Sequence, residues 1–187
     1  MNISNIYCIN LKIRNEKRTI MKKQFKRRKL DVSFHIVDLH ENPKMGCINS
    51  HFEIIKKAKE KNLPYVLILE DDAQILKNIK NIPVPPHDWD MLYLGGYIKE
   101  RFSQHNSNWD IVSSWCTHAY IIHSRIYDKV LNNFKSWASK QPEDKVAIDE
   151  YYIDFIHQNK KSFIVKPQMV VQFDGYSDID QNKNKWK

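Results

Sequence analysis

Glycine is scarce in this chain, and neither of the common glycine-rich phosphate-binding motifs occurs in it. Only four glycines stand among 187 residues, and the sequence contains no GxGxxG and no GxxxxGK[ST]. In such motifs the glycines let backbone amides approach a phosphate closely. The dinucleotide-binding and P-loop classes therefore have no motif support.

Cysteine and long apolar runs are scarce as well. Cys8, Cys47 and Cys116 show no CxxC pair and no zinc-ligand spacing, which indicates reduced thiols in a reducing compartment. No apolar run approaches the roughly 18 residues of a membrane span, and the N-terminus lacks the pattern of a secretory signal. We therefore expect a soluble, cytoplasmic protein, with peripheral contact to a membrane left open.

The length suits one domain with a substantial core. We expect that domain over residues 1–180 and a polar C-terminal tail over residues 181–187. The formal net charge of +8 and the pI near 9.3 favour an anionic partner. A nucleotide, a nucleic acid, an acidic glycan and a membrane surface all meet that description.

Apolar segments alternate with helical patterns along the chain. Strands are expected at residues 6–11, 33–37, 65–69, 90–94, 119–122, 162–165 and 169–171. Helices are expected at residues 15–29, 47–61, 124–134 and 147–158. This alternation predicts an α/β fold with a mostly parallel central sheet flanked by helices.

Two further expectations concern the first helix and the polar segment at residues 99–115. In the first helix, Asn15 is expected to serve as the N-cap, and Ile20, Met21 and Phe25 are expected to face inward. Residues 99–115 are polar and are expected to form a loop.

The most informative segment is an apolar run that leads directly into three acids. Residues 65–69 read Tyr-Val-Leu-Ile-Leu, and Glu70, Asp71 and Asp72 follow. Such a run is typical of a strand buried on both faces, and ligands of open α/β sheets bind at the carboxyl ends of the strands. Adjacent carboxylates repel one another and are best tolerated beside a cation, so the segment predicts a metal and phosphate site, with a solvated acidic turn as the alternative.

Three other features have a structural and a functional interpretation. Asp149 and Glu150 open a helix, where acids stabilise the helix dipole, but either could also act as a general base. His51 lies on an apolar helix stripe, where a buried, hydrogen-bonded histidine is the common case. The basic helix 15–29 is most simply a solvated face, although its first turn could meet a diphosphate, and it lacks the aromatic residues that nucleic-acid binding favours.

Seven short motifs, in order, resemble glycosyltransferase family 25, which includes lipooligosaccharide and collagen galactosyltransferases. The resemblance runs from about residue 5 to residue 180. The motifs are Ile9-Asn10-Leu11 with the later basic pair Lys17-Arg18, Gly46-Cys47-Ile48-Asn49-Ser50-His51, Leu69-Glu70-Asp71-Asp72, Asp90–Gly95, Thr117–Ile122, Ile148-Asp149-Glu150 and Ser177-Asp178-Ile179.

The chain departs from the family pattern at two places. The family usually has Asp-Arg after Ile-Asn-Leu, where this chain has Lys12-Ile13, and Arg14 can supply the arginine with a shift of one residue. A glutamate usually precedes the Gly-Cys pair, where Lys44-Met45 stands here.

The resemblance implies a GT-A (Rossmann-like) fold and transfer of a hexose, galactose or glucose, from a UDP-sugar to a hydroxyl, with inversion. The acceptor is expected to be a glycan, a lipooligosaccharide or a protein. Asp72 and Asp71 would hold Mn²⁺ or Mg²⁺, and Asp149 or Glu150 would be the base. The donor-binding residues implied are Asn10, Leu11, Arg14, Lys17, Arg18, Ser50, His51, Glu70 and Asp71.

A GT-A-like module that binds a glycan or nucleotide without turnover is the alternative from another class. The chain is compact, and its motif flanks are relaxed. Contact with an anionic membrane surface is also compatible with the basic first helix, whereas nucleic acid is disfavoured as a partner.

Overall fold

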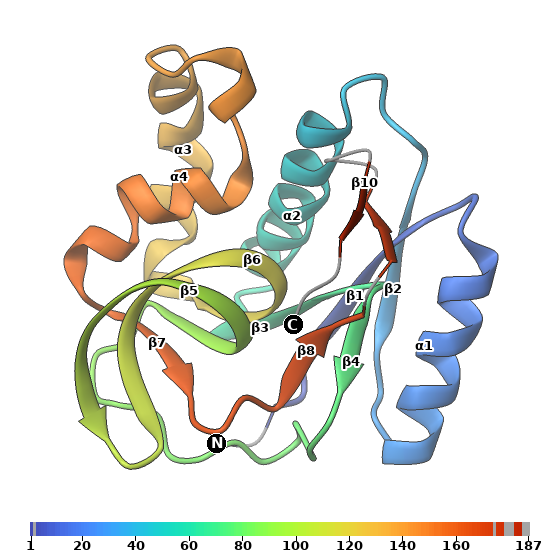
Figure 1. Cartoon of the computed structure of the whole chain (residues 1–187), viewed down its shortest axis with the longest axis horizontal. Helices are drawn as coiled ribbons and strands as arrows, with labels where there is room; N and C mark the ends of the chain where they lie inside the picture. The colour runs from blue at the N-terminus through green and yellow to red at the C-terminus, as the bar shows by residue number, and fades with distance from the viewer. Residues whose placement is uncertain (2, 174, 178–181, 185–187) are drawn as a thin grey trace.

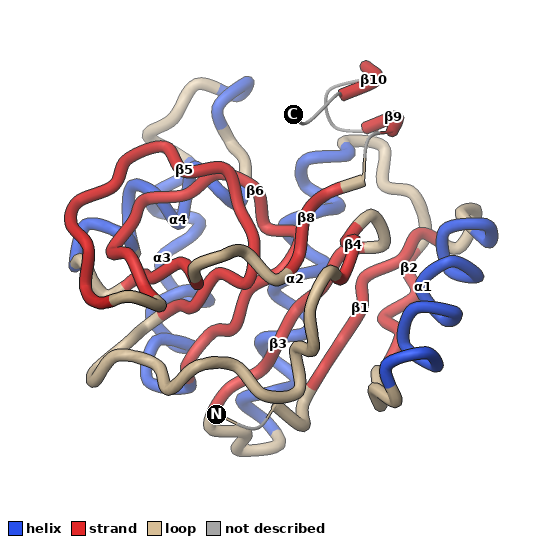
Figure 2. The backbone as a smooth tube through the Cα atoms, turned by 60° about the horizontal axis from the view of Figure 1, so that its bottom comes forward, coloured by secondary structure: helices blue, strands red, loops and turns tan. Residues whose placement is uncertain are grey.

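A six-stranded mixed sheet forms the centre of the molecule (Figure 1). The computed structural model describes residues 1, 3–173, 175–177 and 182–184. The strand order is β2-β1-β3-β6-β5-β7, and all of these strands except β6 run in one direction. Helix α1 covers one face, and α2, α3 and α4 cover the other (Figure 2). The predicted α/β fold with a mostly parallel sheet is confirmed.

The elements follow the predicted alternation. The strands are β1 (Ile6–Leu11), β2 (Ser33–Val37), β3 (Tyr65–Glu70), β4 (Ala73–Ile75), β5 (Met91–Asn106), β6 (Trp109–His123), β7 (Ser162–Val165), β8 (Val170–Gln172), β9 (Gly175–Ser177) and β10 (Asn182–Asn184). The α-helices are α1 (Asn15–Arg28), α2 (Pro43–Glu60), α3 (Tyr127–Ala138) and α4 (Ile148–Phe155). Short 3-10 helices cover Ser124–Ile126, Glu143–Lys145 and His157–Asn159.

Residues 65–69 of strand β3 are all apolar because the strand supplies a core on each of its faces. Val66 and Ile68 pack with the core beneath α2, α3 and α4, whereas Leu67 and Leu69 pack with the core beneath α1. All four are completely buried. Parallel strands with both faces covered by helices show such runs instead of alternation.

The expected loop at residues 99–115 is wrong, because this segment belongs to a long hairpin of β5 and β6. The strands pair from Met91 opposite Ile122 to Asn106 opposite Trp109. The distal part of β5 is exposed on most residues, so it lacks the alternation that identifies a half-buried strand. Gly95 and Gly96, which follow the strand expected at residues 90–94, lie within β5 beside two shifts of register.

Two expectations about α1 are also wrong. The helix begins at Asn15 itself, and the preceding residue, Arg14, is the N-cap without a side-chain cap bond. Ile20 is 46% exposed, whereas Met21 and Phe25 are buried as expected.

Helix α2 begins four residues earlier than predicted, at Pro43, because the Asn42 side chain accepts a hydrogen bond from the Met45 amide.

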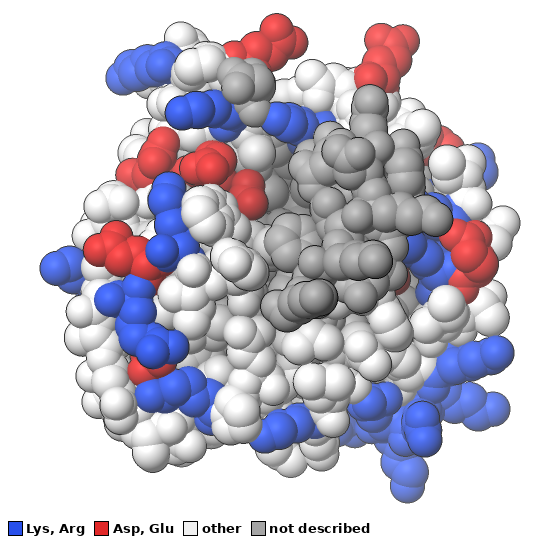
Figure 3. All heavy atoms as spheres, in the orientation of Figure 1, with Lys and Arg blue, Asp and Glu red and all other residues white. Residues whose placement is uncertain are grey.

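The α1 face is strongly basic. Lys and Arg side chains gather over this helix at the lower right of Figure 3. Lys22, Lys23, Lys26, Arg27 and Lys29 are exposed there. None of the described helices combines the length and the hydropathy that a membrane-spanning helix needs.

The C-terminal segment was expected to be a polar tail from residue 181. Residues 182–184 form β10, which pairs with β9 at residues 175–177. The other positions of that tail, together with Asp178 and Ile179 of the last family motif, lie outside the described residues.

Strand β8 crosses close to β5 at the paired glycines. The Met169 amide donates to the Leu94 carbonyl at 2.8 Å, and the Gln168 side chain bonds both the amide and the carbonyl of Gly96. A Cβ atom on Gly95 would lie 1.8 Å from the Val170 carbonyl oxygen. This contact requires glycine at position 95.

We predict that Gly95→Ala lowers the free energy of unfolding by about 3 kcal/mol, since a backbone carbonyl cannot rotate away from the added methyl group. Chemical denaturation measures the change. Gly96→Ala is the matched control, because its obstacle at 2.4 Å is the Ser114 hydroxyl, which can rotate. Equal losses of stability in the two variants would show that the close approach of the Val170 carbonyl is not what requires glycine at position 95.

Candidate functional site

A pocket of about 140 Å³ lies where β1 and β3 end and α2 begins. Because parallel neighbours end at the same edge of the sheet, their last residues meet there. Of the residues with an expected donor role, Asn10, Leu11, Arg14, Ser50, His51, Glu70 and Asp71 line the pocket, and Asp72 lines it too. The structure thus brings together motifs that lie up to 62 residues apart, from Asn10 to Asp72.

Asp71 is compensated by groups from β1 and the start of α1. The Asn10 amide donates to its carboxylate at 2.7 Å in a buried hydrogen bond. Arg14 and Lys17 lie 3.6 and 3.5 Å from the same carboxylate. Asp71 is therefore held by the protein's own cations, and its expected role as a metal ligand stays a prediction.

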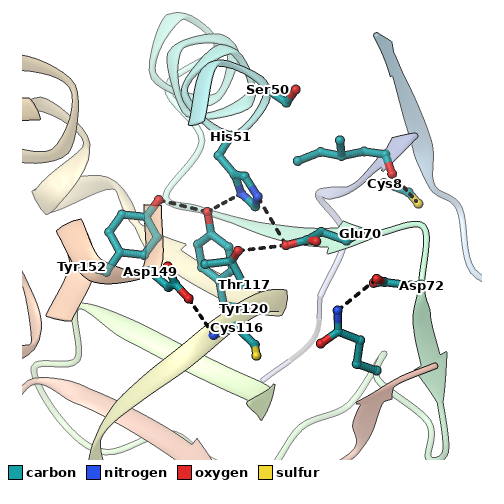
Figure 4. Close-up of polar contacts among 12 residues, drawn as sticks. Cys8, Ser50, His51, Glu70, Asp72, Cys116, Thr117, Tyr120, Asp149 and Tyr152 are labelled. Atoms are coloured by element: carbon teal, nitrogen blue, oxygen red, sulfur yellow. Dashed lines mark hydrogen bonds and ion pairs between the residues drawn. The ribbon is translucent and has the colours of Figure 1, made fainter. Parts of the chain in front are cut away.

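Glu70 lies at one end of a polar chain that passes through the core (Figure 4). Thr117 donates to its carboxylate at 2.8 Å, and His51 Nε2 lies 3.5 Å from the same oxygen. His51 Nδ1 lies 2.8 Å from the Tyr120 hydroxyl, which lies 3.0 Å from that of Tyr152. Burial raises the pKa of Glu70, but His51 and Thr117 outweigh it and hold the pKa below its usual value.

Asp72 is the least compensated of the three acids. The Gln172 amide donates to one carboxylate oxygen at 3.0 Å, and the other oxygen is buried without a hydrogen-bond partner among the described residues. Burial, together with the charge of Glu70, raises the pKa of Asp72 to about 7. The Asn10 and Gln172 side-chain oxygens are likewise buried and unpartnered in the described part of the chain. Unpartnered oxygens beside a carboxylate fit a hard divalent cation.

Asp149 and Glu150 lie at the start of α4 and are not among the residues that line a second pocket, of about 710 Å³. The Cys116 amide approaches the Asp149 carboxylate at 3.4 Å, and Cys116 lines this second pocket. Burial raises the pKa of Asp149, although the amides of Cys116 and Glu150 act in the opposite direction. Glu150 accepts a hydrogen bond from the Trp115 indole at 3.2 Å, and Lys99 lies 3.8 Å away.

Two expected donor residues have other contacts. The Arg18 guanidinium donates to Asn15 and to the Lys12 carbonyl, and Arg18 does not line the pocket. The Ser50 hydroxyl lines the pocket but donates to the Gly46 carbonyl of its own helix at 2.7 Å.

Sequence reasoning assigned no role to three residues that hold the site together, Thr117, Tyr120 and Gln172. Thr117 and Tyr120 lie in a matched family motif, which was their only signal. Gln172 lies 100 residues from Asp72 in a short strand, and no local pattern identifies it.

Comparison with known proteins finds similarity to glycosyltransferases. A family model described as glycosyltransferase family 25 (LPS biosynthesis protein) matches residues 41–113, which include α2, β3 and the acidic turn. A "Glycosyltransferase 25 family member" of Aedes aegypti is 28% identical over 198 residues, covering 81% of this chain and 30% of the relative. "Procollagen galactosyltransferase 1-B" of Xenopus laevis is 26% identical over 51% of this chain and 21% of its own length. The chain thus spans less than a third of these curated relatives.

A solved structure of a glycosyltransferase involved in the glycosylation of the major capsid of PBCV-1 superimposes with a TM-score of 0.57. It is 11% identical, and the match covers 95% of this chain and 96% of the other. The fold is therefore the GT-A fold of glycosyltransferases. The family model and the curated relatives show that the chain is similar to proteins of glycosyltransferase family 25.

We predict that Asp72→Asn changes how stability depends on pH when a chelator keeps metal away. Folded Asp72 retains a proton up to about pH 7, whereas the unfolded chain releases it near its ordinary pKa of 3.8. The wild-type free energy of unfolding should therefore fall as pH rises through that window, and the asparagine variant should escape this fall.

Denaturation at pH 5 and at pH 8 measures the effect. The difference, variant minus wild type, should be about 2 kcal/mol larger at pH 8. Asp128→Asn, on the surface beside Lys59, is the control and should show no such change. A difference that does not depend on pH would contradict the raised pKa of Asp72.

Proposed function

We propose that this chain transfers a hexose, galactose or glucose, from a UDP-sugar to a hydroxyl of a glycan, lipooligosaccharide or protein acceptor, with inversion and with Mn²⁺ or Mg²⁺. The observation that carries the proposal is the unpartnered oxygen of Asp72 in the pocket at the end of β3. This oxygen offers a ligand for a cation in the pocket where the resemblance to family 25 implies that the sugar donor binds. The names of the curated relatives, one a procollagen galactosyltransferase, support transfer of a sugar and galactose as a donor sugar.

On the donor side, Asp72 would hold the cation, with Asp71 on the same turn and the Gln172 side-chain oxygen nearby. A bound divalent cation neutralises charge that develops on the leaving diphosphate. Arg14 and Lys17 keep positive charge beside Asp71, and this charge would attract the anionic donor. Asn10 and Leu11 form the wall of the pocket at the end of β1.

On the acceptor side, Asp149 takes the proton of the attacking hydroxyl. Burial makes its carboxylate a stronger base than an exposed aspartate. The Cys116 amide, from a residue that lines the second pocket, orients it. The acceptor would enter by that pocket. Glu150 is the weaker candidate, because Trp115 and Lys99 already engage its carboxylate.

We predict that the protein releases UDP from UDP-galactose or UDP-glucose when Mn²⁺ or Mg²⁺ is present, and that a chelator stops the release. Asp72→Asn should reduce the rate about 100-fold or more, since the ligand for the cation is lost. A coupled assay for UDP measures the rate, and Asp128→Asn serves as the surface control. Binding of UDP without any release would identify a non-catalytic binding module instead.

We predict that Asp149→Asn lowers kcat for donor hydrolysis, in which water takes the place of the acceptor, by about 100-fold or more while leaving the KM for the donor nearly unchanged. Asp154→Asn is the matched control on the same helix, where the carboxylate accepts a hydrogen bond from Trp137. Turnover of Asp149→Asn close to that of the control would show that the base lies elsewhere.

A further inference from the structure

Cys47, His51 and Glu70 converge at the wall of the first pocket. Cys47 and His51 lie one turn apart on α2, and Glu70 ends β3. One potential ligand atom from each lies within 4.8 Å of the others. All three residues line the pocket.

The orientation of His51 is the second observation. The side chain is fully buried, and its Nδ1 is engaged by Tyr120 at 2.8 Å. Its Nε2 has no hydrogen-bond partner among the described residues, and Glu70 at 3.5 Å is too distant for a good N–H···O bond. A histidine fixed through one nitrogen, with the other directed at a carboxylate, is arranged as metal-binding histidines are.

The phenol chain shows which proton arrangement suits a cation. Nδ1–H can donate to Tyr120, and Tyr120 can donate in turn to Tyr152 at 3.0 Å. In that arrangement Nε2 presents its lone pair toward the Glu70 carboxylate. Without an ion, Nε2 can instead carry the proton that faces Glu70, and a divalent cation would take the place of that proton.

We propose that Cys47, His51 and Glu70 form a second cation site, selective for a borderline-soft divalent ion such as Zn²⁺ and separate from the oxygen site at Asp72. A thiolate and an imidazole favour zinc over Mg²⁺ and Mn²⁺. A thiolate and a carboxylate also balance the charge of the ion, so that the complex is neutral in a poorly solvated wall. Three protein ligands leave the fourth position open toward the pocket for water or an anionic oxygen.

The surroundings of the three ligands are already in place. Thr117 orients Glu70 with its 2.8 Å hydrogen bond, and Tyr120 orients His51. Such outer partners set the position and basicity of ligands. Burial raises the pKa of the Cys47 thiol, so an incoming ion has to displace a proton. Cysteine spacing showed no zinc signal because the third ligand comes from another element.

Cobalt binding tests the site, because Co²⁺ bound to a thiolate gives a charge-transfer band in the near ultraviolet. Titration of the whole protein with Co²⁺ should produce this band with one ion bound, and Zn²⁺ should remove it. Cys47→Ser should abolish the band and weaken Zn²⁺ binding at least about tenfold. Cys8→Ser and Cys116→Ser replace the other two thiols, and Asp72→Asn removes the oxygen site; all three should retain the band.

A measurement on the unaltered protein covers the case in which Cys47→Ser fails to fold. Zn²⁺ should slow alkylation of Cys47 relative to Cys116, as followed by mass spectrometry of peptides. The proposal is overturned if the wild-type protein gives no thiolate band, if the band disappears in Cys116→Ser or Asp72→Asn, or if Zn²⁺ leaves the alkylation of Cys47 unchanged. Since no readout involves a sugar donor, the result is independent of the proposed glycosyl transfer.

Discussion

Three carboxylates on consecutive residues repel one another, and the end of β3 accommodates them by giving each a different environment. Glu70 turns toward Thr117 and His51, and Asp71 turns toward Asn10, Arg14 and Lys17. Among the described residues, the carboxylate of Asp72 accepts a hydrogen bond only from the amide of Gln172. Asp72 is thus the least compensated of the three acids, and its pKa is raised.

This division of partners explains why the pocket draws on so much of the chain. Strand β1 supplies Asn10, the hairpin strand β6 supplies Thr117, and β8 returns from near the C-terminus with Gln172. A strand that is apolar on both faces fixes where the acids emerge, and the surrounding elements determine what each acid meets. The hydrogen bonds that join these distant segments are therefore also the ones that set the charge environment of each acid.

Much of the fold could be predicted from the sequence, because the strands at the centre of the sheet are continuous apolar runs. The acidic turn and the His51 helix were also predictable, since local motifs mark them. The β5–β6 hairpin was not, because its outer half lies in solvent and shows no alternation. Gln172 and the separate partners of the three acids could not be predicted, since they depend on which distant segments meet.

Gln172 lines both pockets. Its side-chain amide donates a hydrogen bond to Asp72 in the first pocket. The hydrogen bond uses one oxygen of Asp72 and leaves the other for a cation. A substitution at position 172 would therefore alter the lining of both pockets at once, through a residue that lies 100 positions from Asp72 in the sequence.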